Sequence, residues 1–216
     1  MTIVLAFDTS QQWCSVSICR DGSIVSRYSE PMVKGQTEIL LPKIHSMLGD
    51  QKMSMQDIHK VVTITGPGSF TGLRVGLASA QGLGVALRVT VLGVSAFRAY
   101  AHCIEGDGDV LVVIDSQKQD VYCQLFSEHG VPLKEPQALL PEEILAYAGK
   151  ESFVVTGSGV AKIISYLPVA CRVKEVSPGE VCDRIAQLAI ERNNDFFEEV
   201  FPFYLKDALV STVSKG

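Results

Sequence analysis

The sequence has no long apolar run and no cluster of basic residues. No apolar stretch approaches the about 20 residues that a membrane-spanning helix needs, and the N-terminus enters an apolar strand without a basic leader. We therefore expect a cytoplasmic protein without membrane contact. The 216 residues carry a net charge of −5, with Lys and Arg dispersed. This negative net charge, with no cluster of basic residues, argues against direct binding of nucleic-acid phosphates.

The sequence also lacks the spacings of metal sites and nucleophilic catalysts. None of its six cysteines forms a C-x-x-C pair, and no two of its four histidines lie three to five residues apart. No serine lies in a well-formed nucleophile elbow. We predict no cofactor, no metal and no catalytic residue. The cysteines are expected to be reduced thiols, mostly buried: Cys14, Cys19, Cys103, Cys123, Cys171 and Cys182.

The segment Val61–Gly84 combines a β-branched strand, a glycine-rich turn and a helical pattern. A phosphate-binding P-loop would need a lysine at the start of the helix, and this chain has Thr71-Gly72-Leu73 there. The turn is therefore better interpreted as structural, with Ser69 or Thr71 capping the helix.

The helix that follows has a stripe of small residues at every fourth position: Gly72, Gly76, Ala80 and Gly84. Residues four apart lie on one side of a helix, and glycine there costs about 1 kcal/mol relative to alanine. Close approach of another backbone would explain the stripe. That neighbour is either the chain's own sheet or another subunit.

A second helix is predicted over Gln36–Leu48, with Thr37 as its N-cap. Pro42 lies inside the pattern, so the helix is either kinked there or begins near Leu41. Its apolar surface is wider than a one-sided amphipathic helix requires. This width favours burial on two sides.

The remaining pattern predicts two similar halves. Ile3–Phe7 is a strand that ends in Asp8-Thr9-Ser10, and Val110–Ile114 runs likewise into Asp115-Ser116. The acidic, glycine-containing loop at 105–109 favours a boundary between lobes 1–104 and 105–216. The last helix, Pro178–Arg192, and the aromatic tail could pack back on the first lobe, and Ser211–Gly216 is expected to be disordered.

Several motifs resemble the TsaB (YeaZ) family: VLAFDTS near the N-terminus, TEILLP, GPGSFTGLRVGLASAQGLG, LGVSAFRAYA, VYCQLF and PFYLKD. The resemblance implies an α/β, actin/Hsp70-like (ASKHA, ribonuclease H-like) fold with two small lobes of mixed sheet plus helices. By the same resemblance Asp8, Thr9 and Ser10 occupy a phosphate-contacting position, although these side chains could equally close a turn. Gln36 and Thr65 depart from the usual family residues, which are His and Arg.

The resemblance implies a non-catalytic scaffold in the complex that installs N6-threonylcarbamoyl on the tRNA adenosine beside the anticodon. The chain would pair with a TsaD-type paralogue, recruit a TsaE-type ATPase, meet tRNA mainly indirectly, and form a homodimer when alone. A large residue at Gly76 or Ala80 should then abolish pairing but leave the fold intact. The expected subunit interface is Glu38, Leu41, Ile44, His45, Gly72, Leu73, Gly76, Leu77, Ala80, Gln81 and Gly84.

Two other functions stay open from the sequence. An actin-like nucleotide-binding phosphotransferase would use Asp8, Thr9 and Asp115, and would show magnesium-dependent ATP binding. A glycoprotease-like peptidase would lose proteolysis when one Ser or His is changed, and the sequence offers no well-formed candidate for it.

Overall fold

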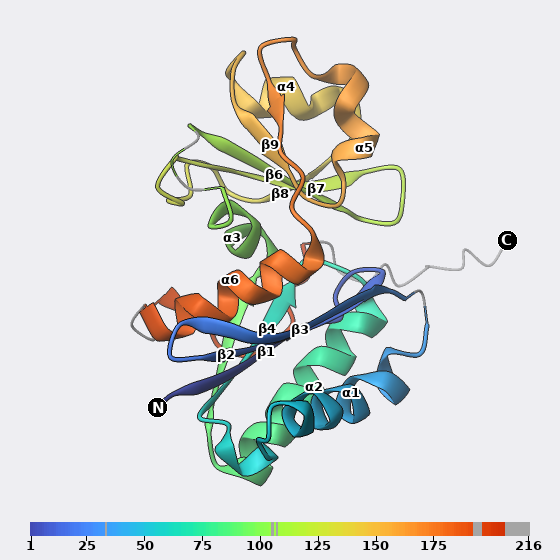
Figure 1. Cartoon of the computed structure of the whole chain (residues 1–216). Coiled ribbons are helices and arrows are strands. Elements are labelled where there is room, and N and C mark those ends of the chain that lie inside the picture. Colours follow the sequence, from blue (N-terminus) through green and yellow to red (C-terminus); the bar gives the residue numbers. More distant parts are fainter. Residues whose placement is uncertain (33, 105, 107, 192–195, 206–216) are drawn as a thin grey trace, which may run out of the picture.

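The chain forms two five-stranded mixed sheets (Figure 1), seen in a computed structural model that describes residues 1–32, 34–104, 106, 108–191 and 196–205. The first sheet has the order β3-β2-β1-β4-β5. Its strands are β1 (Ile3–Asp8), β2 (Trp13–Arg20), β3 (Ser23–Pro31), β4 (Lys60–Gly66) and β5 (Thr90–Ser95). The second has the order β10-β9-β6-β7-β8. Its strands are β6 (Val110–Asp115), β7 (Val121–Phe126), β8 (Gln137–Leu139), β9 (Val154–Thr156) and β10 (Arg172–Val173).

The second sheet repeats the connectivity of the first. In each, the central strand (β1 or β6) pairs antiparallel with the next strand along the chain and parallel with the fourth. The aspartates that end these central strands also correspond. Asp8 accepts a hydrogen bond from the Ser10 backbone N–H at 2.6 Å, and Asp115 accepts one from Gln117 N–H at 2.7 Å. The two similar halves expected from the sequence are therefore confirmed.

The helices form layers on both sides of each sheet (Figure 1). The helices α1 (Gln36–Asp50) and α2 (Phe70–Leu87) cover the outer face of the first sheet. Between the sheets lie α3 (Ala96–Ala101) and α6 (Pro178–Glu191), and α6 packs on β1, β2 and β3. The outer face of the second sheet carries α4 (Ile144–Ala148) and α5 (Val160–Ile163). Short 3-10 helices span Met55–Asp57, Pro141–Glu143 and Ile164–Tyr166.

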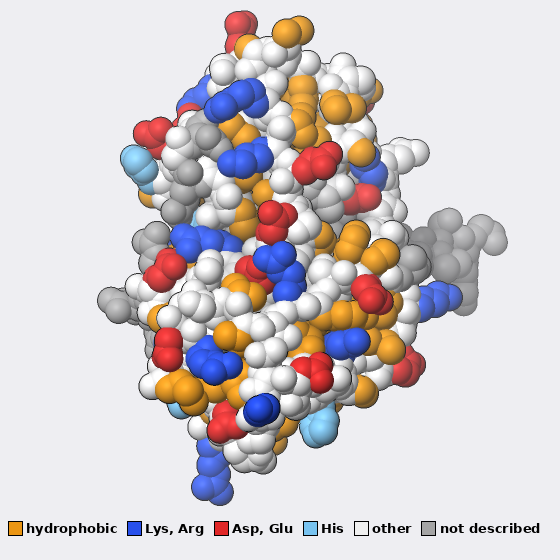
Figure 2. Space-filling model, viewed as in Figure 1, with side chains coloured by type: hydrophobic (Ala, Val, Ile, Leu, Met, Phe, Trp, Pro, Cys, Tyr) orange, Lys and Arg blue, Asp and Glu red, His pale blue; other side chains and the backbone are white. Residues whose placement is uncertain are grey.

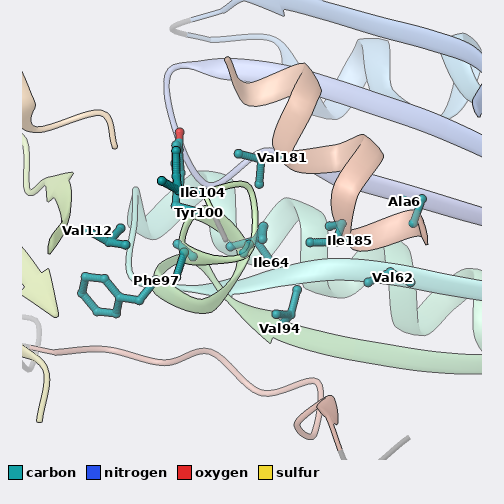
Figure 3. Packing of buried hydrophobic residues seen from close by; sticks show 14 of the residues in the cluster. Ala6, Val62, Ile64, Val94, Phe97, Tyr100, Ile104, Val112, Val181 and Ile185 are labelled. Atoms are coloured by element: carbon teal, nitrogen blue, oxygen red, sulfur yellow. The ribbon is translucent and has the colours of Figure 1, made fainter. Parts of the chain in front are cut away.

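The apolar core between the sheets is continuous (Figure 3). Because side chains alternate along a strand, β1 sends Ile3, Leu5 and Phe7 toward the outer helices. Val4 and Ala6 face the central core. In that core they join side chains of both sheets and of α3 and α6, so α6 is part of a layer that both halves share.

Several local predictions are corrected. The N-cap of α1 is Gly35, not Thr37, because the helix begins at Gln36. Pro42 lies inside that helix, which runs on to Asp50. The two-residue β10 and three-residue β8 were not predicted, since segments this short carry no periodicity.

Other predictions stay open. The lobe boundary at 105–109 remains a prediction, and Glu105 and Asp107 lie outside the described residues. The Ser211–Gly216 end, for which disorder was expected, also lies outside them. In the described part of the chain, no helix has the length and apolar character to cross a membrane.

Candidate functional site

The glycine-rich turn packs against the end of β1. The Ser69 backbone N–H donates to the Ser10 carbonyl oxygen at 2.6 Å, and the Thr9 hydroxyl donates to the Gly72 carbonyl oxygen at 2.7 Å. Ser69 caps α2, as predicted, since its side chain accepts from Gly72 N–H at 3.4 Å. The glycine-rich turn and the Asp8-Thr9-Ser10 segment are therefore joined by hydrogen bonds between their polar groups.

The small-residue stripe of α2 faces the chain's own sheet. A Cβ atom added at Gly72 would lie 1.9 Å from the Thr9 carbonyl oxygen, and one at Gly76 would lie 2.8 Å from Thr9 Oγ1. At Gly84 the same atom would lie 2.2 Å from Val91 Cγ2 on β5. The stripe could pack on the chain's own sheet or on another subunit, and these distances support packing on the sheet. The expectation that a large residue at Gly76 leaves the fold intact is therefore wrong, because no space exists there.

The eleven expected interface residues divide into two groups. Seven are buried within the chain and help to hold α1 and α2 on the sheet: Ile44, Gly72, Leu73, Gly76, Leu77, Ala80 and Gly84. Four are exposed: Glu38, Leu41, His45 and Gln81. Whether any of them contacts another subunit stays a prediction, but only the second group lies on the surface of this chain.

A different strip of α2 is exposed and was not predicted. It contains Ala78, Gly82, Val85 and Ala86, and Val85 has 83% of its surface exposed. A Cβ atom at Gly82 would meet nothing within 4 Å. We call Ala78, Gly82, Val85 and Ala86 the α2 strip. Ala78, Gly82 and Ala86 also recur every fourth residue, so the sequence did contain this signal. This second repeat was overlooked because the stripe at Gly72, Gly76, Ala80 and Gly84 lies in the same helix and has the same spacing.

The α2 strip continues into a groove at the beginning of the helix. The groove has a volume of about 400 Å³, and Thr37 of α1 lies opposite Phe70, Arg74 and Ala78 of α2. The Arg74 guanidinium lies 3.6 Å from the centre of the Phe70 ring. Figure 2 shows apolar side chains exposed among charged ones on the lower lobe, which carries both helices.

The C-terminal segment 196–205 runs along the other side of α2. Glu198 pairs with Gly93 at the edge of β5, and Phe203 N–H donates to the Thr65 carbonyl oxygen at 2.8 Å. Gln81 donates to the Val200 carbonyl oxygen at 2.9 Å. The Thr65 hydroxyl also hydrogen-bonds the Glu198 carboxylate, so this departure from the family pattern has an intramolecular partner. The α2 strip is thus bordered by α1 and by this segment.

Asp8 lies at the end of β1 with only 4% of its surface exposed. Burial raises the pKa of its carboxyl, and the hydrogen bonds from Ser10 partly offset that rise. In the described ranges no three His, Cys, Asp or Glu side chains come together as metal ligands would. The contacts of Asp8, Thr9 and Ser10 favour the turn-closing interpretation, and a phosphate contact stays a prediction.

Replacement of Asp8 by Asn tests the energetic consequence of this burial. A carboxyl whose pKa is raised by folding stabilises the folded state below its unfolded pKa, and that stability is lost as pH rises through the folded pKa. An asparagine at this position would keep the acceptor for Ser10 N–H and never ionise. We expect the stability of Asp8→Asn relative to wild type to increase as the pH rises above about 4, the pKa of an aspartate in the unfolded chain. Melting curves that shift in parallel over this range would contradict the argument.

Comparison with known proteins identifies the family. The model of the family "TsaD: tRNA N6-adenosine threonylcarbamoyltransferase" matches residues 30–150. The Bacillus subtilis protein named tRNA threonylcarbamoyladenosine biosynthesis protein TsaB is 31% identical over 57% of this chain and 54% of its own length. The Escherichia coli protein of the same name is 32% identical over 66% of this chain. The chain belongs to the TsaB (YeaZ) family. The match covers 64% of the Escherichia coli protein, so it spans less than two thirds of both relatives.

The fold of this TsaB-family chain agrees with a solved structure. A crystal structure of a Pseudomonas aeruginosa protein with similarity to peptidase YEAZ superposes with a TM-score of 0.78 at 24% identity. The superposition covers 95% of this chain and 100% of the other. Two halves of equivalent connectivity are what the actin-like fold implies, and both are present. The expected fold class is therefore confirmed.

Proposed function

We propose that this TsaB-family chain is a non-catalytic subunit of the complex that forms threonylcarbamoyladenosine in tRNA. It pairs with a TsaD-type paralogue through the exposed surface of α1 and α2 and helps to recruit a TsaE-type ATPase. The names of the curated relatives support the pathway. The observation that carries the pairing surface is the α2 strip, which none of the described residues covers.

The composition of α2 suits contact with another helix. Between Arg74 and Arg88 the helix has no charged residue, so little charge would be desolvated on docking. The small side chains of the α2 strip allow a second backbone to come close. Leu41 of α1, which is 42% exposed, follows Thr37 by one helical turn and adds apolar surface on the side of α1 that lies beside α2. The same surface would pair two copies of this chain when the paralogue is absent.

The net charge supports an indirect role toward tRNA. The net charge is −5, and the sequence contains no run of Lys and Arg of the kind that contacts a phosphate backbone. The Thr9 hydroxyl and the Asp8 carboxylate both hydrogen-bond within the chain, which supports a structural role for them. Both features are consistent with a subunit that positions its partners.

Val85→Glu tests the pairing surface. A carboxylate in the middle of a helix-to-helix contact would be buried without a partner, so we expect the affinity for the TsaD-type paralogue to fall at least tenfold. The measurement is light scattering after size exclusion, with the paralogue from the same organism titrated in. The variant alone should also dissociate into monomers at concentrations where wild type self-associates.

Val169→Glu is the matched control, since Val169 is fully exposed and lies in the second half of the chain. It introduces the same charge and should leave pairing unchanged. If Val85→Glu binds the paralogue as wild type does, the α2 strip is not the contact. If the wild-type protein itself does not bind the paralogue, the proposed function is wrong.

A further inference from the structure

An exposed arginine lies at one end of the α2 strip. Arg74 precedes Ala78 by one helical turn, so the two side chains lie on the same side of α2. Its guanidinium lies 3.6 Å from the centre of the Phe70 ring. Among the described residues, no carboxylate or carbonyl oxygen accepts a hydrogen bond from Arg74.

Other arginines of the chain have such acceptors. Arg184 donates to the Glu191 carboxylate at 3.0 Å, and Arg98 donates to the Phe196 carbonyl oxygen at 2.8 Å. The N–H groups of a guanidinium point outward in its own plane, so stacking on a ring does not use them. Arg74 can therefore donate to an acceptor on another molecule.

The position of Arg74 is supported from below by two aromatic rings. Phe70 contacts Tyr204, with 5.5 Å between the ring centres. Tyr204 follows Phe203, whose backbone N–H donates to the Thr65 carbonyl oxygen at 2.8 Å. We call Tyr204, Phe70 and Arg74 the Arg74 stack. A side chain that is already held in place loses less entropy when it binds a partner.

The surroundings of Arg74 determine what kind of partner suits it. It is the only charged residue lining the groove of about 400 Å³, to which Thr37, Thr71 and Ser79 contribute hydroxyl groups. The helix α2 contains no Asp or Glu. A surface that docks here would remove water from a lone cation, which is costly unless that surface supplies a negative group. One cation suits one carboxylate, whereas a nucleic-acid backbone requires several clustered cations.

We propose that Arg74 binds a carboxylate of the TsaD-type paralogue, on a helix that docks along the α2 strip. The inference rests on the proposed function and specifies the chemistry of the partner: a helix with an uncharged contact face and an Asp or Glu at one end of it. The carboxylate accepts two parallel N–H groups of the guanidinium. Tyr204 is a positioning residue, since it acts through Phe70.

Arg74→Met removes the charge and keeps an unbranched apolar side chain. We expect the affinity for the paralogue to fall about tenfold, measured by titration in light scattering after size exclusion. Wild-type affinity should also decrease between about 50 mM and about 500 mM NaCl, and that of the variant should decrease less. A loss of packing alone would leave the salt dependence unchanged.

Lys43→Met is the matched control. Lys43 is also a cation over an aromatic ring, 4.4 Å from the centre of Tyr28. It follows Thr37 by six residues and so lies on another side of α1. Its replacement should leave the affinity and its salt dependence unchanged. Melting curves establish that each variant is folded.

Two substitutions at Tyr204 test the positioning role. Tyr204→Leu removes the ring under Phe70 and should weaken pairing about threefold, with the salt dependence retained. Tyr204→Phe keeps the ring and should bind as wild type does. Equal affinities of the two variants would contradict the role of the ring.

The outcomes separate this inference from the proposed function. If folded Arg74→Met binds the paralogue as wild type does while Val85→Glu does not bind, the pairing surface stands and the carboxylate contact is wrong. If Arg74→Met loses self-association as strongly as it loses the paralogue, the carboxylate belongs to a second copy of this chain. If the chain alone binds tRNA and Arg74→Met reduces that binding, the acceptor is a phosphate. Each of the last two results would overturn the assignment to the paralogue.

Discussion

Gly72→Ala should destabilise the protein by about 3 kcal/mol, although alanine is the better helix former. The added methyl group would lie 1.9 Å from the Thr9 carbonyl oxygen. That oxygen cannot retreat freely, because Thr9 Oγ1 donates to Gly72 O and Ser69 N–H donates to Ser10 O. In a chain of this size the melting temperature should fall by roughly 6 to 12 °C, measured by circular dichroism.

Gly82→Ala is the matched control, since it makes the same substitution in the same helix. Nothing lies within 4 Å of a Cβ atom at Gly82. The gain in helix propensity should therefore stabilise the protein by about 0.5–1 kcal/mol. If both variants gain stability, the contact between α2 and the end of β1 is looser than described. If both lose it, the exposed side of α2 is also packed.

The two glycine variants also show what the sequence could and could not predict about the site. The pattern at Gly72, Gly76, Ala80 and Gly84 indicated close approach of a backbone. The structure contains such an approach at Gly72, whereas side chains of the sheet approach Gly76 and Gly84. The sequence did not reveal which backbone approaches. That depends on how β1 and β4 meet under α2, a contact between residues about 60 positions apart. The α2 strip was therefore identified only from the exposure of its side chains in the structure.

The fold was more predictable than the site because its signals are local. The β2–β3 hairpin with its turn at Asp21-Gly22 and the Ser95 cap of α3 are both determined by residues that are neighbours in the sequence. The similarity between the ends of β1 and β6 was also visible in the sequence. In contrast, a cavity between the halves combines Gln11, Ser158 and Glu175, whose proximity is set by tertiary packing alone.

The layer between the sheets explains why the two halves should unfold together. Phe97 of α3 is fully buried there, among side chains of β4, β5, β6 and α6. Neither sheet can cover this inner face by itself, since α3 and α6 fill the space between them (Figure 1). A cavity at Phe97 therefore weakens a core that belongs to both halves.

Phe97→Ala should reduce the free energy of unfolding by about 3–5 kcal/mol, through lost apolar burial and an unfilled cavity. Denaturant unfolding followed by circular dichroism should show one transition at a lower midpoint, with both sheets lost together. Phe201→Ala is the control, because Phe201 is 65% exposed and its truncation should change the midpoint little. Two separate transitions, of which only one responds to Phe97→Ala, would mean that the halves are independent.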